Sequence, residues 1–462
     1  MSFKIRLSLI LGKALGFTSR LMKVGGGSTL PGRVVRRMNP RFVPSMVREL
    51  PRGSILVTGT NGKTTTATLL ASILDRAGIT PVHNRTGANL MAGIASVLIR
   101  ESDLGGRLAV QVGLFEVDEA ALPSAVDETS PRLVLVNNLF RDQLDRYGEL
   151  DTLAGRMREA VEDLEDEAVV ALNADDPLVA GIGRELDRTV LYYGIDTARY
   201  AAESMERAAD SKHCARCGFR LEYEYYLFGH MGSYHCPNCG LSRPALDVAA
   251  TKIEVAGIEG TRCTIRYPGG TMDVVIPLPG LYNVYNVLAA VTCSIAMGVD
   301  PDIIAASVER FTAAFGRVER VETKDRSILM ILAKNPAGFN EVARTLTGEP
   351  VRKCAILALN DNIADGRDVS WIWDTDMELF RGGLEKIICS GARAWDMALR
   401  VKFAELEQDA LSVEPDLELA LDMGLENVAP GETLYVVPTY TAMLELRRLM
   451  VKRGLVTPFW EG

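Results

Sequence analysis

The sequence lacks several features that are typical of membrane proteins, of nucleic-acid-binding proteins and of enzymes with a cysteine nucleophile. No run of eighteen apolar residues occurs, so no segment is expected to span a membrane. The net charge is −9 and there is no long basic run, which disfavours nucleic acid as a main partner. Only four histidines occur, three of them within residues 213–235, and there is no Gly-x-Cys-x-Gly turn. A cysteine nucleophile with a local histidine partner is therefore not predicted.

A disulfide framework is also not expected. Four of the eight cysteines are scattered through apolar or strand-like segments, which is typical of a reducing cytoplasm: Cys263, Cys293, Cys354 and Cys389. The sequence has no internal repeat and no low-complexity tract. Its 47% hydrophobic and 24% charged residues are typical of globular proteins, and 462 residues are enough for two or three domains.

The other four cysteines form two Cys-x-x-Cys pairs, Cys214 with Cys217 and Cys236 with Cys239. A glycine follows each pair and lets the chain turn back, so that N–H groups face the sulfur atoms. Four thiolates suit a tetrahedral Zn²⁺ without an open position. The spacing predicts a structural zinc ribbon inserted at residues 205–247. A redox site fits two matched pairs poorly, and the local composition is not basic enough to favour nucleic acid.

A phosphate-binding loop is predicted at residues 59–65. The apolar residues 55–57 indicate a buried parallel strand, and a helical pattern follows up to Gly78, where a C-terminal cap is expected. The turn between them directs backbone N–H groups at an anion, Lys63 adds a positive charge, and the Thr64 hydroxyl can hold Mg²⁺. The predicted ATP-binding residues of the loop are Thr60, Asn61, Gly62, Lys63, Thr64 and Thr65.

Further buried strands are expected at residues 110–115, 133–136 and 168–172, with helices between them. This alternation predicts a doubly wound, mostly parallel α/β sheet whose sites gather at the carboxyl ends of its strands. Glu116 closes the first of these strands. We expect its carboxylate to hold Mg²⁺ together with Thr64, and the alternative is a solvated acidic turn.

Residues 1–24 combine basic and apolar side chains. Lys13 interrupts the apolar stretch, and no cleavage site of a signal peptide follows. Two interpretations stay open: a basic amphipathic helix that touches a membrane surface, or a helix that docks on its own domain. A glycine-rich linker follows at residues 25–32.

Several of these features together resemble the Mur ligase and folylpolyglutamate synthase superfamily. The loop, Glu116 and residues 173–176, 279–286 and 315–317 occur in the order and spacing of that family. Its members use ATP to convert a carboxylate into an acyl phosphate, which an amine then attacks. By position, the resemblance implies that Asn89 and Asn286 contact adenine and that Arg317 contacts phosphate.

Three positions depart from the family pattern. Gln143 stands where the family has a histidine, Arg158 falls near a lysine that many members carbamylate, and Ile331 replaces an aspartate that binds ribose. An amino-acid co-substrate handled in the usual way is therefore not expected.

Residues 359–374, and a zinc ribbon within a Mur ligase core, are similar to the MurT family, the ATPase subunits of lipid II isoglutaminyl synthase. The resemblance implies amidation of the α-carboxyl of D-glutamate in lipid II, giving D-isoglutamine. It also implies the cofactors ATP, Mg²⁺ and Zn²⁺, and ammonia from a GatD-type glutamine amidotransferase partner. The expected location is the cytoplasm, with the inner face of the membrane as an option. The alternative is a stand-alone ligase for amino acids.

In that family, a carboxylate of the ligase subunit completes the catalytic triad of the partner. Asp365 lies in an expected turn, where an aspartate usually caps its own backbone, and Asp374 and Asp376 are expected helix caps. Asp368 borders the apolar segment 369–373, whose packing could fix its direction. Asp368 is therefore the predicted catalytic residue, and Asp374 is the second choice.

The predicted domains are residues 1–50 for the N-terminal helix and linker, 51–315 for the ATP-binding domain, and 316–462 for a C-terminal α/β domain that contacts the partner. In the last domain, strands are expected near residues 328–332, 354–359, 386–389 and 433–437.

Overall fold

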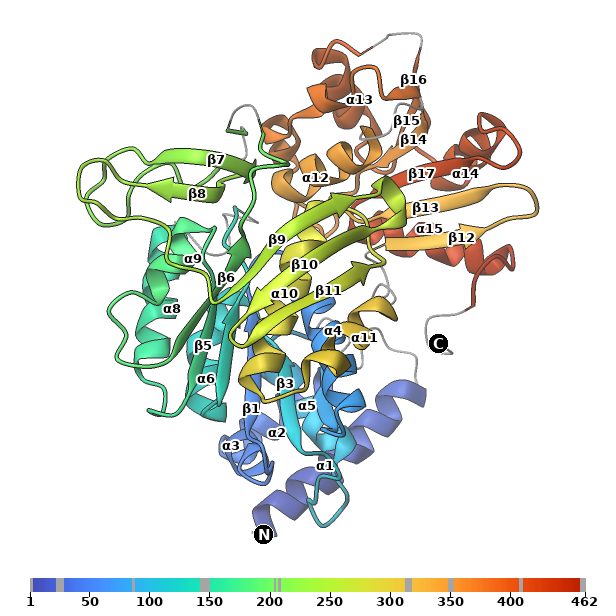
Figure 1. Ribbon diagram of the computed structural model, residues 1–462. Helices are drawn as coiled ribbons and strands as arrows, with labels where there is room; N and C mark the ends of the chain where they lie inside the picture. The colour runs from blue at the N-terminus through green and yellow to red at the C-terminus, as the bar shows by residue number, and fades with distance from the viewer. Residues whose placement is uncertain are drawn as a thin grey trace.

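The computed structural model describes residues 3–21, 29–84, 88–141, 150–202, 205–206, 209–311, 318–347, 353–406 and 410–457. Two mixed sheets and a two-stranded hairpin organise this part of the chain (Figure 1).

The first sheet has nine strands in the order β11-β10-β9-β6-β5-β4-β1-β3-β2. All neighbouring strands from β9 to β2 are parallel, whereas β9, β10 and β11 form antiparallel pairs at one edge. The predicted doubly wound, mostly parallel sheet is thus confirmed. Its strands are β1 (Ser54–Thr58), β2 (Pro81–His83), β3 (Val112–Glu116), β4 (Leu133–Val136), β5 (Val169–Asn173), β6 (Val190–Ile195), β9 (Val248–Val255), β10 (Thr261–Tyr267) and β11 (Gly270–Ile276).

Helices cover both faces of this sheet. They are α1 (Phe3–Leu21), α2 (Leu30–Met38), α3 (Phe42–Val47), α4 (Lys63–Arg76), α5 (Met91–Glu101), α6 (Leu122–Thr129), α8 (Leu150–Glu162), α9 (Pro177–Ile182), α10 (Leu281–Ala296) and α11 (Pro301–Glu309), with short 3-10 turns η1 (Glu119–Ala121) and η2 (Gly257–Glu259). Successive residues of β1 point to opposite faces. Ile55 and Val57 pack with α4, α10 and α11, and Leu56 packs with α5, α6 and α8. The central strand is therefore buried on both sides, as its apolar sequence predicts.

The second sheet has the order β12-β13-β17-β14-β15-β16, and only β12 pairs antiparallel. Its strands are β12 (Val318–Glu322), β13 (Ser327–Ile331), β14 (Lys353–Ala358), β15 (Leu384–Ser390), β16 (Leu411–Val413) and β17 (Thr433–Pro438). Its helical segments are α12 (Pro336–Thr347), η3 (Ser370–Asp374), η4 (Met377–Phe380), α13 (Ala394–Phe403), α14 (Leu417–Glu426) and α15 (Tyr440–Lys452). The four predicted strands are confirmed. The domain boundary near residue 315 stays a prediction, since residues 312–317 lie outside the described ranges.

The hairpin of β7 (Glu222–Phe228) and β8 (Met231–His235) extends beyond β6 at the left of Figure 1. It lies between the two cysteine pairs in the chain, where the zinc ribbon is predicted.

The N-terminal helix α1 docks on its own domain, against α2 and α5, through Ile5 and Leu9.

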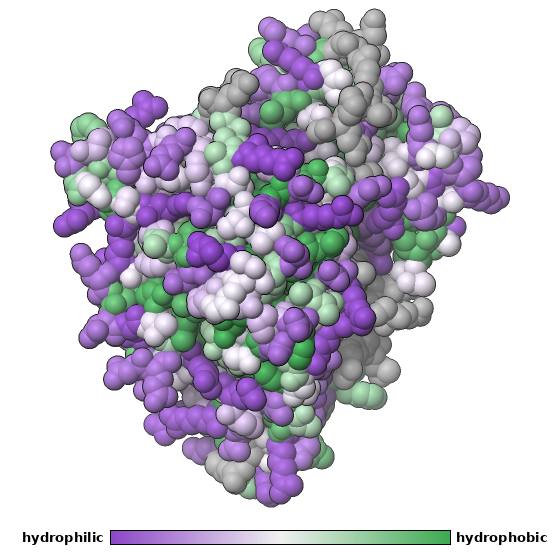
Figure 2. Space-filling view, viewed as in Figure 1, coloured by the Kyte–Doolittle hydropathy of each residue, from purple (hydrophilic) through white to green (hydrophobic). Residues whose placement is uncertain are grey.

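Hydrophilic side chains cover most of the face shown in Figure 2. Within the described ranges, no helix is long and apolar enough to cross a membrane.

Candidate functional site

The predicted phosphate-binding loop is held in place by backbone and side-chain contacts. Gly59 and Gly62 have positive φ angles of 125° and 84°, and a Cβ on Gly62 would lie 2.0 Å from Oδ1 of Asn286. The N–H of Thr60 donates to the carbonyl of Asn138 at 2.9 Å, and the N–H of Asn61 donates to Oδ1 of Asn138 at 2.8 Å. The segment after β4 therefore fixes the turn between β1 and α4.

Lys63, the first residue of α4, is buried and ion-paired. Its Nζ lies 3.1 Å from Oε2 of Glu119 and also donates to the carbonyl of Gly59. Burial disfavours the charged form, but Glu119 and then Glu116 outweigh burial and raise the pKa of Lys63. Burial likewise opposes ionisation of Glu119, and Lys63 outweighs it and lowers the pKa of that carboxyl. Both partners are therefore charged.

Glu116 lies beside the loop, as predicted, and is only 3% exposed. The alternative of a solvated acidic turn is therefore wrong for this residue. The hydroxyl of Thr64 donates to Oε1 of Glu116 at 2.9 Å, whereas Oε2 is buried without a hydrogen-bond partner in the described part of the chain. Asn84 fixes the strand end by accepting from the Glu116 N–H and donating to its carbonyl, both at 2.8 Å. An orphaned carboxylate oxygen beside a hydroxyl fits the oxygen ligands that Mg²⁺ prefers.

A cavity next to the loop is lined from both sheets. Asn61, Thr65 and Asn286 border it on one side, and Leu332 and Glu341 border it on the other. The predicted adenine contact Asn286 thus lies in the cavity wall.

Asn89 does not line this cavity. Its carbonyl accepts from the N–H of Asp118 at 2.9 Å, so Asn89 lies near the end of β3. The structure therefore brings Asn286, but not Asn89, to the cavity.

Of Arg317, Gln143 and Arg158, which the sequence singles out, the structure describes Arg158 alone. Arg317 and Gln143 lie outside the described residues. Arg158 pairs with Glu162 at 2.8 Å and with Glu185 at 3.5 Å, and it lines a separate cavity beside Cys214. The geometry does not place Arg158 where a carbamylated lysine would serve the nucleotide.

The C-terminal part contributes two residues that the sequence did not reveal. Nδ2 of Asn335 donates to Oδ1 of Asn61 at 2.9 Å and so joins the second sheet to the loop. Glu341 lies in the cavity wall on α12. Asn335 lies four residues after Ile331, which departs from the family pattern, so a signal existed nearby. Glu341 occupies a turn of an ordinary amphipathic helix and has no such signal.

Glu341 shares one cation with a second carboxylate. Nη1 of Arg344 donates to Oε1 of Glu341 at 2.8 Å and also pairs with Glu206. Burial raises the pKa of Glu341 to about 7, although Arg344 opposes the shift. Glu206 also accepts from Asn340 at 2.9 Å, so this cluster joins α12 to the segment that leads into the hairpin.

The four paired cysteines converge. Their sulfur atoms all lie within 4.8 Å of one another, with 3.6 Å from Cys214 to Cys239 and 3.5 Å from Cys217 to Cys236. A tetrahedral site with Zn–S bonds of about 2.3 Å has sulfur atoms about 3.8 Å apart, so the cluster fits Zn²⁺.

The two cysteine turns have the same geometry. Gly218 and Gly240 have φ angles of 73° and 71°. The N–H groups of Phe219 and Leu241 face the sulfur atoms of Cys217 and Cys239. The glycines after the two cysteine pairs predict N–H groups that face the sulfur atoms, and the structure has them.

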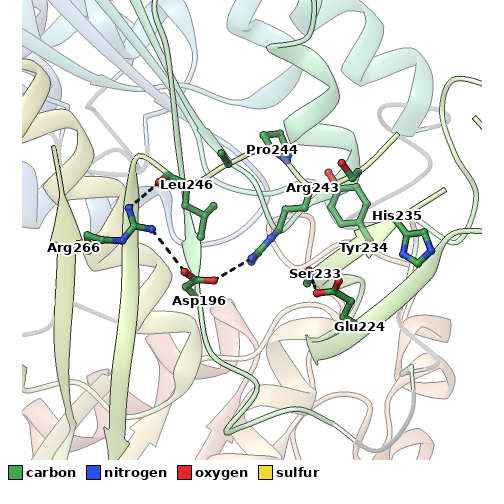
Figure 3. A pocket seen from close by; sticks show the side chains of 11 residues that line it. Asp196, Glu224, Ser233, Tyr234, His235, Arg243, Pro244, Leu246 and Arg266 are labelled. Carbon is green, nitrogen blue, oxygen red and sulfur yellow. Dashed lines mark hydrogen bonds and ion pairs between the residues drawn. The ribbon is translucent and has the colours of Figure 1, made fainter. Parts of the chain in front are cut away.

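Asp175 anchors the hairpin to the first sheet. It accepts hydrogen bonds from Tyr285 Oη at 2.6 Å and Arg243 Nη1 at 2.9 Å. Figure 3 shows Arg243 pointing toward Asp196, which also pairs with Arg266 of β10. These residues line a cavity of about 520 Å³, and none of the residues of the phosphate-binding loop lines it. Asp175 therefore joins the hairpin and α10 to the first sheet.

A second anchor connects the hairpin to the cavity next to the loop. Nε2 of the buried His230 lies 3.3 Å from Asp176, and its ring lies 4.6 Å from that of Phe140. Burial opposes the charge of His230, but Asp176 outweighs it and raises its pKa. Phe140 and Phe228 stack at 6.1 Å and both line the cavity. The hairpin thus forms part of the cavity wall.

The predicted catalytic residue Asp368 is exposed on the loop before η3. Its Oδ1 accepts from the N–H of Ser370 at 2.8 Å, which lowers the pKa of the carboxyl. Asp374, the second choice, is exposed in η3.

Asp365 and Asp376, expected to cap their own backbone, have different partners. Asp365 is buried and accepts from the N–H of Thr441 at 2.8 Å in the first turn of α15, instead of capping its own turn. Asp376 accepts from Asn340 at 3.0 Å and makes no capping bond to η4. Both carboxylates are engaged in tertiary contacts, which leaves Asp368 and Asp374 as the exposed candidates.

Two family descriptions match this chain. The family described as Mur ligase middle domain matches residues 57–294, and MurT ligase C-terminal matches residues 332–443. The MurT subunit of lipid II isoglutaminyl synthase (glutamine-hydrolyzing) from Streptococcus pneumoniae is 33% identical over 99% of this chain and 99% of its own length. Its counterpart from Staphylococcus aureus strain COL is 34% identical over 90% of this chain and 91% of its length.

A solved structure shows the same fold. A pseudomurein peptide ligase type C from Methanothermus fervidus matches with a TM-score of 0.67 at 22% identity, covering 87% of this chain and 79% of that one. Similarity to the MurT subunits extends over nearly the whole chain, and both family descriptions match. The chain therefore belongs to the Mur ligase family and, within it, to the MurT family.

Proposed function

We propose that this chain is the ATP-dependent ligase subunit of a lipid II isoglutaminyl synthase. It activates the α-carboxyl of D-glutamate in the stem peptide of lipid II, and ammonia converts that carboxyl into the amide of D-isoglutamine. The observation that carries the proposal is a phosphate loop with the Thr64–Glu116 pair beside it, in a chain similar over 99% of its length to a subunit of that name. We place the enzyme in the cytoplasm, at the membrane face where lipid II is available.

The loop supplies the nucleotide site. Its N–H groups and the N-terminus of α4 suit the phosphates, and the charged Lys63 can move its ion pair from Glu119 to a phosphate oxygen. Thr64 and Glu116 would hold Mg²⁺, and Asn286 would border the adenine. When bound, ATP supplies the phosphoryl group that activates the substrate carboxylate.

Glu341 is the proposed ribose contact in place of the aspartate that Ile331 has replaced. Its carboxylate lies in the cavity wall contributed by the second sheet, where a hydroxyl donor would find an acceptor. Asn335, which reaches Asn61, keeps this wall against the loop.

The four cysteines would bind a structural Zn²⁺. Their four sulfur atoms leave no open coordination position, so the ion would stabilise the hairpin and take no part in the chemistry. Through Phe228 and His230, the hairpin supports the wall of the nucleotide cavity.

Ammonia must come from another protein, since no nucleophilic cysteine with a local histidine is predicted in this chain. We propose a GatD-type glutamine amidotransferase that docks beside Asp368. Trp373 is exposed five residues later, and its ring lies 5.5 Å from that of the exposed Phe403 on α13. Trp395 and Leu399 extend this apolar surface along α13. Aromatic side chains at such a surface are typical of protein interfaces.

Asp368 would orient the histidine of the partner. An aspartate beside an imidazole holds the tautomer and stabilises the charged form. The hydrogen bond from Ser370 fixes one oxygen of Asp368, and the side chain is otherwise exposed toward a partner.

Release of ADP with different nucleophiles tests the proposal. With lipid II and ATP, ammonium should stimulate ADP release, and neither an amino acid nor a polynucleotide should do so. Stimulation by an amino acid alone would favour the stand-alone ligase. Glu116→Gln, which preserves size but removes the charge at the metal site, supplies the background rate.

A further inference from the structure

The outward face of α1 carries an apolar stripe. Phe3 is 81% exposed, Leu7 50%, Ile10 54% and Phe17 64%. Their spacing of four, three and seven residues places all of them on one side of the helix. Solvent-facing helix surfaces of globular proteins are usually polar, so this exposed apolar stripe indicates a binding surface.

The opposite face of α1 already holds the helix on its domain. Ile5 and Leu9 are buried, and Gly12 packs so closely that a Cβ would lie 2.9 Å from Cδ1 of Ile99. Nζ of Lys13 donates to the carbonyl of Arg100 at the end of α5, at 3.2 Å. The outward stripe is therefore presented from a fixed helix and is not needed for the fold.

This end of the molecule is strongly basic. Ten of the 51 Lys and Arg residues lie within residues 1–48, and none of the 60 Asp and Glu residues does. Lys4 and Arg6 are exposed and flank the stripe, and Arg33 and Arg37 are exposed on the neighbouring α2. Figure 1 shows α1 and α2 at the end of the molecule opposite the second sheet. Arg36 of α2 is paired with Glu128 of α6, but Lys4, Arg6, Arg33 and Arg37 give α1 and α2 an exposed positive charge, although the whole chain is acidic.

We propose that α1 is an interfacial helix that binds the surface of an anionic lipid bilayer. Phe3, Leu7, Ile10 and Phe17 enter the boundary between headgroups and acyl chains, and the basic side chains contact the anionic headgroups. A second copy of the chain fits this face poorly, because two such basic surfaces repel each other. The inference rests on the proposed function, since it brings the ligase to the surface that holds its lipid-linked substrate.

Flotation with vesicles tests this proposal without catalysis. The full chain, alone and with its partner subunit, is mixed with vesicles of phosphatidylcholine or of phosphatidylcholine with phosphatidylglycerol, without lipid II. It should float with the anionic vesicles and not with the neutral ones. Replacing the four stripe residues with glutamine should weaken binding at least about tenfold, since it removes the inserted apolar surface. Arg6→Gln with Arg33→Gln and Arg37→Gln should weaken binding to the anionic vesicles without changing the stripe.

A matched variant controls for surface polarity. Leu104→Gln, Val275→Gln and Leu419→Gln change exposed apolar residues elsewhere and should leave vesicle binding unchanged. Absence of binding, or equal binding by the stripe variant, would overturn the proposal. Two further outcomes would overturn it: the wild-type chain associates with itself and the stripe variant does not, or the stripe variant alone fails to bind the partner subunit. Failure of the amidation assay would not alter vesicle binding, so the two proposals can fail separately.

Discussion

The hydroxyl of Thr64 donates a 2.9 Å hydrogen bond to one oxygen of Glu116, and the other oxygen is buried without a hydrogen-bond partner among the described residues. A buried carboxylate oxygen in this state carries a desolvation cost, which a bound cation would offset. The pair joins the first turn of α4 to the end of β3, next to the phosphate loop. The magnesium hypothesis therefore rests on the geometry of Thr64 and Glu116 themselves.

Glu116→Gln should lower ATP-dependent amidation by about 100-fold or more, because an amide binds Mg²⁺ far more weakly than a carboxylate. Raising the Mg²⁺ concentration should restore part of the rate. Amidation rates measured across a magnesium titration check this, with Asp127→Asn on the surface of α6 as a control of equal charge change. A wild-type rate for Glu116→Gln would remove the metal role from this residue.

Lys63→Met should abolish amidation, with a loss of at least about 100-fold. It should also destabilise the protein by about 3–5 kcal/mol, because Glu119 is left buried without its cation. The double variant Lys63→Met/Glu119→Gln should regain most of the thermal stability while remaining inactive. Melting curves and amidation rates separate the two effects. Turnover by the stable double variant would show that Lys63 does not serve the phosphates.

Cys236→Ser should lose about one Zn²⁺ per chain and loosen the hairpin. Because Phe228 and His230 support the nucleotide cavity, the KM for ATP should rise more than kcat falls. Elemental analysis and ATP kinetics check this. Cys263→Ser, at a buried cysteine outside the cluster, is the control for zinc content. Protein purified without chelators that contains no zinc would refute the site.

Asp368→Asn should abolish glutamine-dependent amidation by the complex, by about 100- to 10,000-fold, and leave ammonium-dependent amidation intact. The hydrogen bond from Ser370 can persist with asparagine, so the loop should keep its conformation. Asp374→Asn is the matched control in the same exposed segment. If Asp374→Asn instead removes glutaminase activity, the orienting carboxylate is Asp374.

Glu341 should make stability depend on pH. Burial raises its pKa from an ordinary 4.5 to about 7, so the folded protein retains a proton that the unfolded chain releases in this interval. The stabilisation from this proton is full below pH 4.5 and is lost as the pH rises through about 7. Melting temperatures of wild type should therefore fall relative to Glu341→Gln between these values. Equal pH profiles would contradict the shift, and Glu309→Gln on α11 provides a surface control.

The position of the loop beside Glu116 was predictable because the residues that determine it are close together in the sequence or on neighbouring strands. A strand, a glycine turn and Lys63-Thr64 occur in one stretch, and Glu116 ends an apolar strand that parallel pairing brings alongside. The paired cysteines likewise carry their own spacing. For these residues, a short segment determines both the backbone and the ligand-facing group.

Contacts between distant segments could not be predicted in this way. Asn335 meets Asn61 across 274 positions, and Glu341 enters the cavity from a helix whose pattern shows only packing. Asp365 has a turn-like sequence, yet its carboxylate accepts from Thr441 in α15. Tertiary packing decides such pairings, and local propensity does not record it.

The product formed from nitrogen-15-labelled ammonium tests amidation most directly. The 462-residue chain is incubated with ATP, Mg²⁺, lipid II and labelled ammonium, and the stem peptide is analysed by mass spectrometry. We predict ATP-dependent replacement of one hydroxyl by a labelled amino group at the α-carboxyl of D-glutamate, absent from Glu116→Gln. Lipid II that keeps its free α-carboxyl while ATP is consumed, or that gains an amino acid instead, would contradict the proposed function.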